Sequence, residues 1–171
     1  TALENFIYKC LFQLMIKASK NIVSEPDKLF QLLSPFRKNS NLIFNRQFAN
    51  ILLNLDINYA DEVVEWLLDN PHQKFRVGND NEEPVWKLAG KLIKKFSPHC
   101  NQENFDRLEN TIYYFLPNYN LEQIKWHLES TRKNYYTPYW GKTQYHLLPK
   151  LDHSRISNRS EQLIAVINRR F

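Results

Sequence analysis

Histidines and cysteines are the side chains of this sequence best suited to nucleophilic or metal chemistry. His99 and Cys100 are adjacent, so their side chains do not readily converge on one reacting atom, whereas a nucleophile and its base normally come from separate elements. His146, Asp152 and His153 are the residues closest to a metal-ligand set, but no pattern of supporting residues accompanies them. The sequence therefore predicts no catalytic residue, no metal site and no cofactor.

Motifs for other enzyme classes are missing as well. The sequence has no HExxH, no CxxC and no glycine-rich loop followed by Lys-Ser/Thr, which are typical of zinc proteases, zinc or redox sites, and phosphate loops. Paired acids occur at Asp61-Glu62 and Glu82-Glu83, in polar surroundings where nothing would raise a carboxylate pKa for general acid catalysis. We therefore expect a protein that is not an enzyme.

The most distinctive stretch spans residues 132–151, RKNYYTPYWGKTQYHLLPKL, where basic residues alternate with aromatic ones. Such a stretch suits single-stranded nucleic acid, with rings stacked on bases and cations on phosphates. It equally suits a protein interface anchored by Tyr, Trp and Arg, and a third interpretation is that the rings pack a connector onto neighbouring helices. The candidate interaction surface consists of Arg132, Lys133, Tyr135, Tyr136, Tyr139, Trp140, Lys142 and Tyr145.

Charge is unevenly distributed along the chain. The formal net charge is +5, a modest excess that does not by itself identify a nucleic-acid binder. Acids dominate between residues 56 and 83, and bases dominate from residue 132 to the end. This asymmetry is expected either to steer a partner or to keep a solvated surface soluble.

Two amphipathic helices are predicted at the centre of the sequence, within residues 86–115. Ser97-Pro98 ends the first, because the residue before proline avoids the α region, and Asn101 caps the second. The outer face of the second helix includes Glu109. Such a pair cannot bury its apolar stripes alone, so it needs further helices on either side. The outer face of the first helix carries Lys87, Lys91, Lys94 and Lys95.

Apolar periodicity and helix caps predict about nine helices and no strand, which makes the fold class all-α. We interpret it as stacked antiparallel helix pairs, either an irregular α-solenoid or a helical bundle. The chain is a single helical domain or a section of a larger array, with a polar loop near 76–84 as its internal boundary. The other seven helices are expected at about 3–22, 26–36, 44–55, 60–68, 120–128, 145–151 and 157–171.

The compartment is predicted from cysteine use and hydropathy. Two cysteines suggest no disulfide framework, so a reducing, cytoplasmic location is expected. No apolar run approaches the length of a membrane span, and we expect no membrane contact. The chain starts without Met and stops within a helical pattern, so we interpret it as a section of a larger protein.

Two stretches resemble a known family. WKLAGKLIKKFSPHCNQENFDRLENTIYYF, from Trp86, is similar to the run A-x-x-L-I…F-S-P-H-C…F…L-E…I…Y. YWGKTQYHLLPKLDHSRIS, from Tyr139, with Phe171 at the end, is similar to Y-G-x-x-Q-Y-x-L-L-x-A-L…R-x-S…K-F. Both resemble the long helical region of large bacterial STAND-type ATP-binding proteins, relatives of NACHT ATPases and of the antiviral Avs group. The resemblance covers about the second half of the chain.

This resemblance implies a non-catalytic helical section that senses a trigger, often a foreign protein, and holds an NTPase inactive until then. It carries neither ATP binding nor an effector activity to this chain, because the motifs for both are absent here. The implied partner is another domain of the same chain or a trigger protein, and nucleic acid is the alternative. The matching positions, expected to be structural, are Trp86, Leu92, Ser97, His99, Cys100, Leu108, Glu109, Gly141, Gln144, Tyr145, Leu147 and Leu148.

Overall fold

The computed structural model describes residues 41–77, 85–116 and 141–169, together with the single residues 17, 28 and 31. Over these ranges the chain is helical and contains no strand, so the predicted all-α class is confirmed there. Outside the described residues lie the helix predicted at 120–128, residues 78–84 of the loop predicted near 76–84, and all but positions 17, 28 and 31 of the helices predicted at 3–22 and 26–36. The elements are α3 (Leu42–Leu52), η2 (Ile57–Tyr59), α4 (Ala60–Asp69), α5 (Pro71–Lys74), α6 (Lys87–Phe96), α7 (Gln102–Tyr113), α9 (Lys142–Leu147), η3 (Leu148–Lys150) and α10 (Asn158–Ile167).

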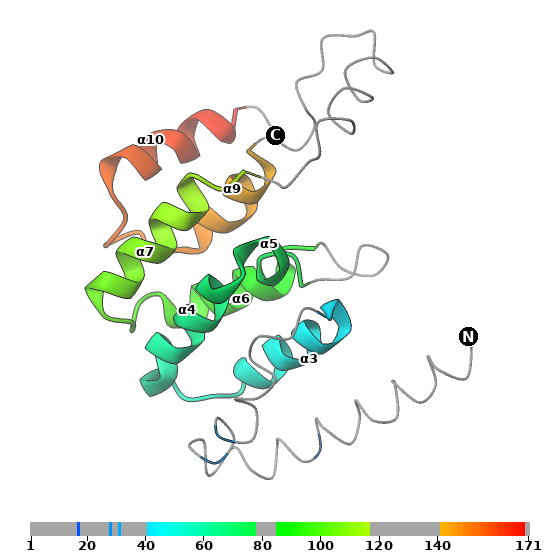
Figure 1. The fold of residues 1–171 in the computed structure, drawn as a ribbon. Helices are drawn as coiled ribbons and strands as arrows, with labels where there is room; N and C mark the ends of the chain where they lie inside the picture. Colours follow the sequence, from blue (N-terminus) through cyan, green and yellow to red (C-terminus); the bar gives the residue numbers. More distant parts are fainter. Residues whose placement is uncertain are drawn as a thin grey trace, which may run out of the picture.

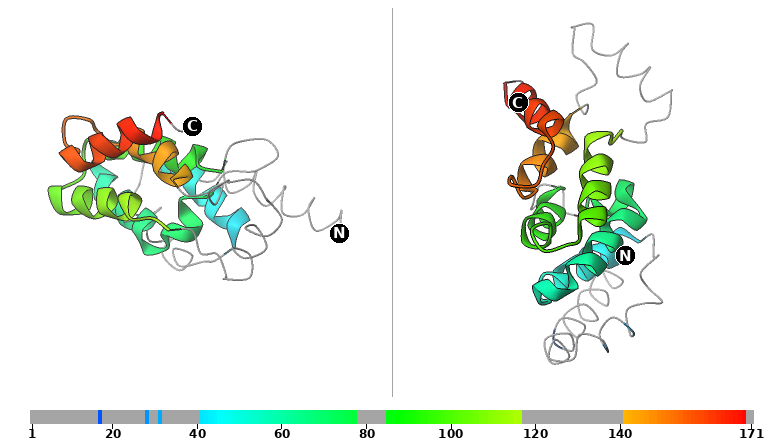
Figure 2. Two further views of the ribbon diagram at one scale, coloured as in Figure 1. Left: turned by 90° about the horizontal axis from the view of Figure 1, so that it is seen from above. Right: turned by 90° about the vertical axis from the view of Figure 1, so that its left-hand side faces the viewer.

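Helix α6 occupies the middle of the described part. It contacts α3 and α4 on one side, and α9 with the 3-10 turn η3 on the other. Helix α7 contacts α4 and α9, and α10 contacts α9 and η3. The helices therefore follow one another along a single direction, with α3 at one end and α10 at the other (Figure 1 and Figure 2). A repeating unit and a total of nine helices stay predictions.

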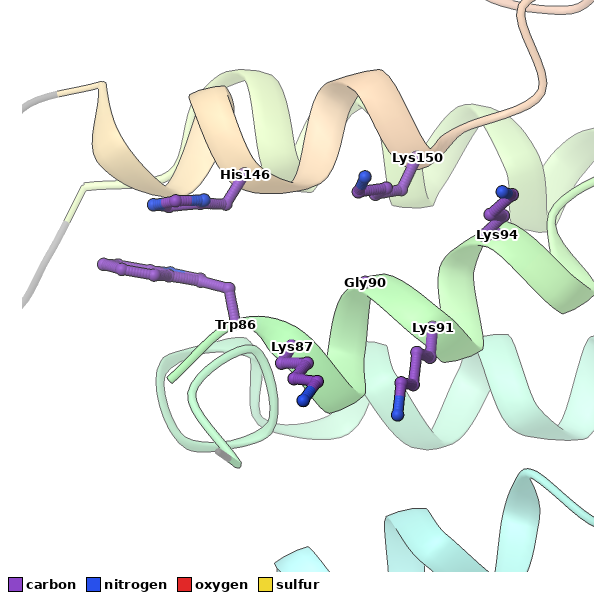
Figure 3. Close-up of a pocket in the computed structure, with 7 residues that line it drawn as sticks. All are labelled: Trp86, Lys87, Gly90, Lys91, Lys94, His146 and Lys150. Carbon is purple, nitrogen blue, oxygen red and sulfur yellow. The ribbon is translucent and has the colours of Figure 1, made fainter. Parts of the chain in front are cut away.

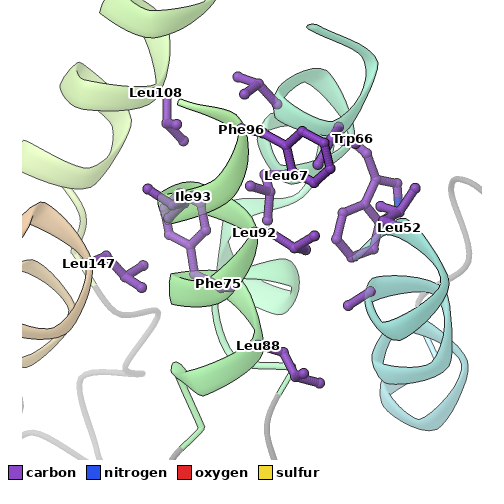
Figure 4. Packing of buried hydrophobic residues seen from close by; sticks show 14 of the residues in the cluster. Leu52, Trp66, Leu67, Phe75, Leu88, Leu92, Ile93, Phe96, Leu108 and Leu147 are labelled. Atoms are coloured by element: carbon purple, nitrogen blue, oxygen red, sulfur yellow. The ribbon is translucent and has the colours of Figure 1, made fainter. Parts of the chain in front are cut away.

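The apolar stripes of these helices meet in one core (Figure 4). Its largest side chain, Trp66 of α4, is 1% exposed and stacks on Phe48 of α3 with 5.2 Å between ring centroids. Each large apolar side chain buried in this way contributes about 1.5–3 kcal/mol of stability. Every helix that flanks α6 supplies at least one of them, as shown by Leu52, Leu67, Leu92, Phe96, Leu108 and Leu147.

Helix ends agree with most of the predicted signals. Helix α6 ends at Phe96 with Ser97 as its C-cap, but Ser97 has φ −61° and ψ −28°, within the α region that it was expected to avoid. The Asn101 side chain accepts a hydrogen bond of 2.8 Å from the amide of Asn104 at the start of α7. Pro71 lies at the boundary between two helices. Helix α4 does end just before it, at Asp69, but Pro71 also begins the short helix α5. Proline fits the first turn of a helix because N–H groups there have no intrahelical acceptor, so the N–H that proline lacks costs no hydrogen bond.

One lysine of α6 ties this helix to α3. The Nζ of Lys95 donates to the carbonyl oxygens of Leu53 at 2.9 Å and Leu55 at 2.6 Å, just beyond the end of α3. These carbonyls follow the last turn, where oxygens lack intrahelical partners and a cation is favourable. Lys95 was expected on the solvent-facing side of α6, and the structure places it as a half-buried connection between two helices.

Candidate functional site

The structure describes two residues of the candidate interaction surface. Lys142 and Tyr145 both lie on α9, where they are half-buried, and the Tyr145 ring meets the edge of the His146 ring with centroids 5.0 Å apart. The remaining members lie outside the described residues, and their placement stays a prediction. They are Arg132, Lys133, Tyr135, Tyr136, Tyr139 and Trp140.

Helix α9 is positioned by two residues of its own sequence. Gly141 precedes it with φ 83°, a left-handed conformation that costs other L-residues about 1–2 kcal/mol. Gln144 is buried and donates from Nε2 to the carbonyl oxygens of Tyr113 at 3.3 Å and Phe115 at 2.8 Å. Because these carbonyls end α7, one amide side chain both satisfies that helix end and fixes α9 beside it.

A second connection joins the end of α6 to the segment before α10. Arg155 donates from Nη1 to the carbonyl oxygens of Ser97 at 2.8 Å and Cys100 at 2.9 Å, and its guanidinium lies 4.3 Å from the centroid of the Phe105 ring. The Ser97 hydroxyl accepts a bond of 3.1 Å from the amide of Asp152. The two sequence stretches that carry the family resemblance are therefore in direct contact.

Glu109 makes a third connection and corrects one prediction. The sequence placed it on the outer face of α7, but it is only 4% exposed. Its Oε1 accepts from the amide of Ser157 at 2.8 Å and from the Ser157 hydroxyl at 2.7 Å, at the cap of α10. Burial acts to raise the pKa of Glu109, but hydrogen bonds from Ser160 and Ser157 outweigh it and hold the pKa below the ordinary value of 4.5.

Trp86 joins the start of α6 to α9. Its indole Nε1 donates to the Thr143 hydroxyl at 3.2 Å, and its ring stacks on His146 with centroids 4.4 Å apart and planes 18° apart. Burial lowers the pKa of His146, and the positive charges of Lys142 and Lys150 lower it further. The imidazole is therefore mainly neutral at neutral pH.

A basic pocket of about 270 Å³ opens beside this aromatic pair (Figure 3). One wall is α6, and the other is α9 with η3. No acidic side chain occurs among the described residues that line it. We call it the α6–α9 pocket, and its lining residues are Trp86, Lys87, Gly90, Lys91, Lys94, His146 and Lys150.

Gly90 lies where the two walls meet. A Cβ atom at this position would lie 3.4 Å from the Cγ of Lys150 and 3.8 Å from a methyl group of Leu147. The α6 backbone therefore lies directly against the side chains of α9 and η3. An added Cβ at Gly90 would therefore be at ordinary contact distance from the opposite wall.

The residues considered for catalysis or metal binding are placed apart. His99 is exposed, whereas Cys100 is buried, and burial raises the pKa of its thiol, the opposite of the shift that activates a cysteine nucleophile. His146 stacks on Trp86, while Asp152 accepts from the amide and hydroxyl of Ser154. Among the described residues, no three His, Cys, Asp or Glu side chains gather as a metal site would require.

Sequence reasoning found the lysines of α6 but missed the pocket. Lys87, Lys91 and Lys94 were recognised as a basic face, because their spacing places them on one side of a helix. Lys150 was assigned to a separate short helix, and no local pattern indicates that it would face α6. The signal that could have been used is Gly90, a glycine inside a strongly helical pattern, which often marks a close approach of another element.

We compared the chain with protein-family models, with curated proteins and with solved structures, and none of the three comparisons found a match. The resemblance to STAND-type proteins therefore stays a prediction. Within the described ranges, no helix combines the length and apolar character needed to cross a bilayer.

Proposed function

We propose that this chain is a non-catalytic helical segment of a larger bacterial, cytoplasmic STAND-type NTPase, and that it recognises protein. Its partner is another domain of the parent chain or a trigger protein, and the parent protein acts in antiviral defence. In this proposal the helices form a scaffold of stacked pairs, and residues 132–145 supply the contact surface. Tyr, Trp and Arg, which are abundant in that surface, dominate the binding energy of protein interfaces.

The observation that carries this proposal is the role of the matching positions. Two of them, Gln144 and Glu109, bind backbone groups at the end of a helix far away in the sequence, and Arg155 of the R-x-S run does the same. Leu92, Leu108, Leu147 and Leu148 are buried in the core. These residues connect helices to one another, which supports a scaffold role for the chain. The exposed faces of such a scaffold are available for recognition.

Two steps test the scaffold proposal in its natural context. Reading the full coding sequence comes first, and a Walker A loop upstream of this segment is the expected result. Isolation of the full-length protein with its cross-linked partners comes second, and a protein joined to residues 132–145 is expected. A parent chain without an NTPase motif contradicts the family assignment. Complete absence of protein cross-links to this segment contradicts the recognition role.

The second candidate function is nucleic-acid binding through the basic C-terminal third. The α6–α9 pocket favours it, because three lysines of α6 and Lys150 from the opposite wall are among its lining residues. Lys142 and Tyr145, from the predicted surface, lie on α9 beside the pocket residue His146. Binding carried by phosphates must weaken steeply as salt rises, so a salt titration with an oligonucleotide tests this function. No binding at low salt contradicts it.

A further inference from the structure

The α6–α9 pocket concentrates positive charge beyond what its own walls neutralise. Lys91, Lys94 and Lys150 are exposed, and none of them forms a salt bridge with a residue in the described part of the chain. Like charges around one concavity repel one another, and low-dielectric walls strengthen the field inside it. An anion in the pocket would relieve this repulsion.

The lysines come from two separate walls of the pocket. Lys87, Lys91 and Lys94 recur at helical spacing along α6, which spreads them over about 10 Å at a rise of 1.5 Å per residue. Figure 3 shows Lys94 directed toward the wall that carries His146 and Lys150. Lys87 and Lys91 extend in Figure 3 to the side of α6 away from that wall, so Lys94 and Lys150 are the cations that face each other across the pocket. An anion could be held between these two.

The pocket's composition selects among anions. It contains no arginine among its described lining residues, and arginine is the side chain that matches a carboxylate with two parallel hydrogen bonds. Lysine acts as a compact point charge and is a common phosphate ligand. The volume of about 270 Å³ lies just below the range of about 300–1,000 Å³ typical of pockets that enclose a whole drug-sized ligand. Phosphate groups therefore fit inside, while the rest of their molecule stays outside.

We infer that the α6–α9 pocket binds phosphate groups of a single-stranded nucleic acid, with Lys94 and Lys150 gripping one phosphate and Lys91 contacting the next. The lysine row along α6 favours an extended ligand over a compact one. The stacked rings of Trp86 and His146 close one end of the pocket. This inference deepens the second proposed function and rests on it, since it names the residues that hold the strand.

Fluorescence anisotropy tests the inference with the 171-residue chain and a fluorescein-labelled oligothymidylate. The test variant Lys91→Gln/Lys94→Gln/Lys150→Gln removes three pocket charges. The matched control Lys17→Gln/Arg76→Gln/Arg169→Gln removes three charges at exposed positions that do not line the pocket. Thermal unfolding of all three proteins checks that each is folded.

The test variant is expected to bind about tenfold or more weakly than wild type, and the control within about twofold of it. The slope of log K against log salt should become shallower by about 1.4 in the test variant alone, since the three lysines contact two phosphates and each phosphate neutralised on a single strand contributes about 0.7. Equal weakening of the control overturns the pocket site. Unchanged binding by the test variant also overturns the pocket site, but it is compatible with nucleic-acid binding elsewhere on the chain. No binding by wild type at low salt overturns both.

Two competitors identify the ligand chemistry. Inorganic tripolyphosphate should displace the oligonucleotide from wild type and raise its melting temperature, without raising that of the test variant. If tripolyphosphate displaces the labelled oligonucleotide at a far lower concentration than unlabelled oligonucleotide does, the pocket binds a free phosphate compound. That result would overturn the inference that its ligand is a nucleic-acid strand. Polyglutamate, which carries carboxylates, should displace the oligonucleotide poorly, and equal displacement would contradict a phosphate site.

Discussion

Arg155 holds the backbone of Ser97 from 58 positions further along the chain, with 2.8 Å between its Nη1 and the Ser97 carbonyl oxygen. The Ser97 hydroxyl in turn accepts from the amide of Asp152, so the contact is made in both directions. Carbonyl groups at the end of a helix lack intrahelical partners. Arg155 supplies one for α6, and in doing so it fixes the segment that leads into α10.

The first prediction concerns the geometry of this contact. Arg155→Lys retains the positive charge but loses the fork that reaches two carbonyl oxygens and the planar group over Phe105. The free energy of unfolding should fall by about 1–3 kcal/mol, measured by urea denaturation. Arg169→Lys, at an exposed position, should change it by less than about 0.5 kcal/mol. Equal effects of the two variants would show that Arg155 contributes charge alone.

The second prediction is a pH dependence. The pKa of Glu109 is lowered in the folded state, so its carboxylate stabilises the fold above pH 4.5, and this contribution disappears as the pH falls through the folded pKa. Glu109→Gln should lower the free energy of unfolding by about 1–2 kcal/mol at neutral pH. The difference from wild type should shrink below pH 4.5, in urea denaturation measured over a pH series. A difference that stays constant across acid pH would contradict the assigned ionic role.

The third prediction uses two glycines with opposite expectations. Gly141→Ala places a Cβ at φ 83° and should destabilise the protein by about 1–2 kcal/mol. Gly90→Ala is its matched control, because Gly90 is helical and the added Cβ would make only ordinary contacts, the nearest being the flexible Lys150 side chain at 3.4 Å. Alanine favours a helix over glycine by about 1 kcal/mol, so this variant should be neutral or slightly stabilising. Thermal unfolding measures both, and a reversed order would contradict the described backbone.

The fourth prediction concerns the end of α3. Lys95→Met keeps the length and apolar stem of the side chain but removes the donor to Leu53 and Leu55. The free energy of unfolding should fall by about 1–3 kcal/mol, because two half-buried carbonyl groups lose a charged partner. Lys91→Met on the exposed face of α6 is the control and should change it by less than about 0.5 kcal/mol. Equal values would indicate that water replaces Lys95 at no cost.

Local signals predicted most of the described helices correctly. The apolar stripes of α6 and α7 and the cap at Asn101 are properties of a few neighbouring residues, so they can be recognised in sequence alone. Helix α5 was missed because Pro71 follows one helix and begins the next, and the same residue type gives both signals. Glu109 was misplaced because its partner, Ser157, is 48 positions away and leaves no local pattern.

The candidate site shows the same division between local and distant information. The lysine face of α6 was predicted from helical spacing, but its pairing with Lys150 depends on how α9 and η3 pack against Gly90. The contact between the two family-like stretches also depends on tertiary packing. Ser97 and Arg155 were noticed as separate letters of a pattern, and only the fold shows that they bind each other.

Site-specific photo-cross-linking in the full-length parent protein tests the recognition role most directly. A photoreactive phenylalanine analogue at Tyr145 reports on the candidate surface, and the same analogue at Glu62, exposed on α4, is the control. The scaffold proposal predicts a discrete protein adduct from position 145 that position 62 does not give. A nucleic-acid adduct at position 145 would contradict protein recognition and support nucleic-acid binding, the second candidate function. The same adducts at both positions, or none at position 145, would contradict recognition through this surface.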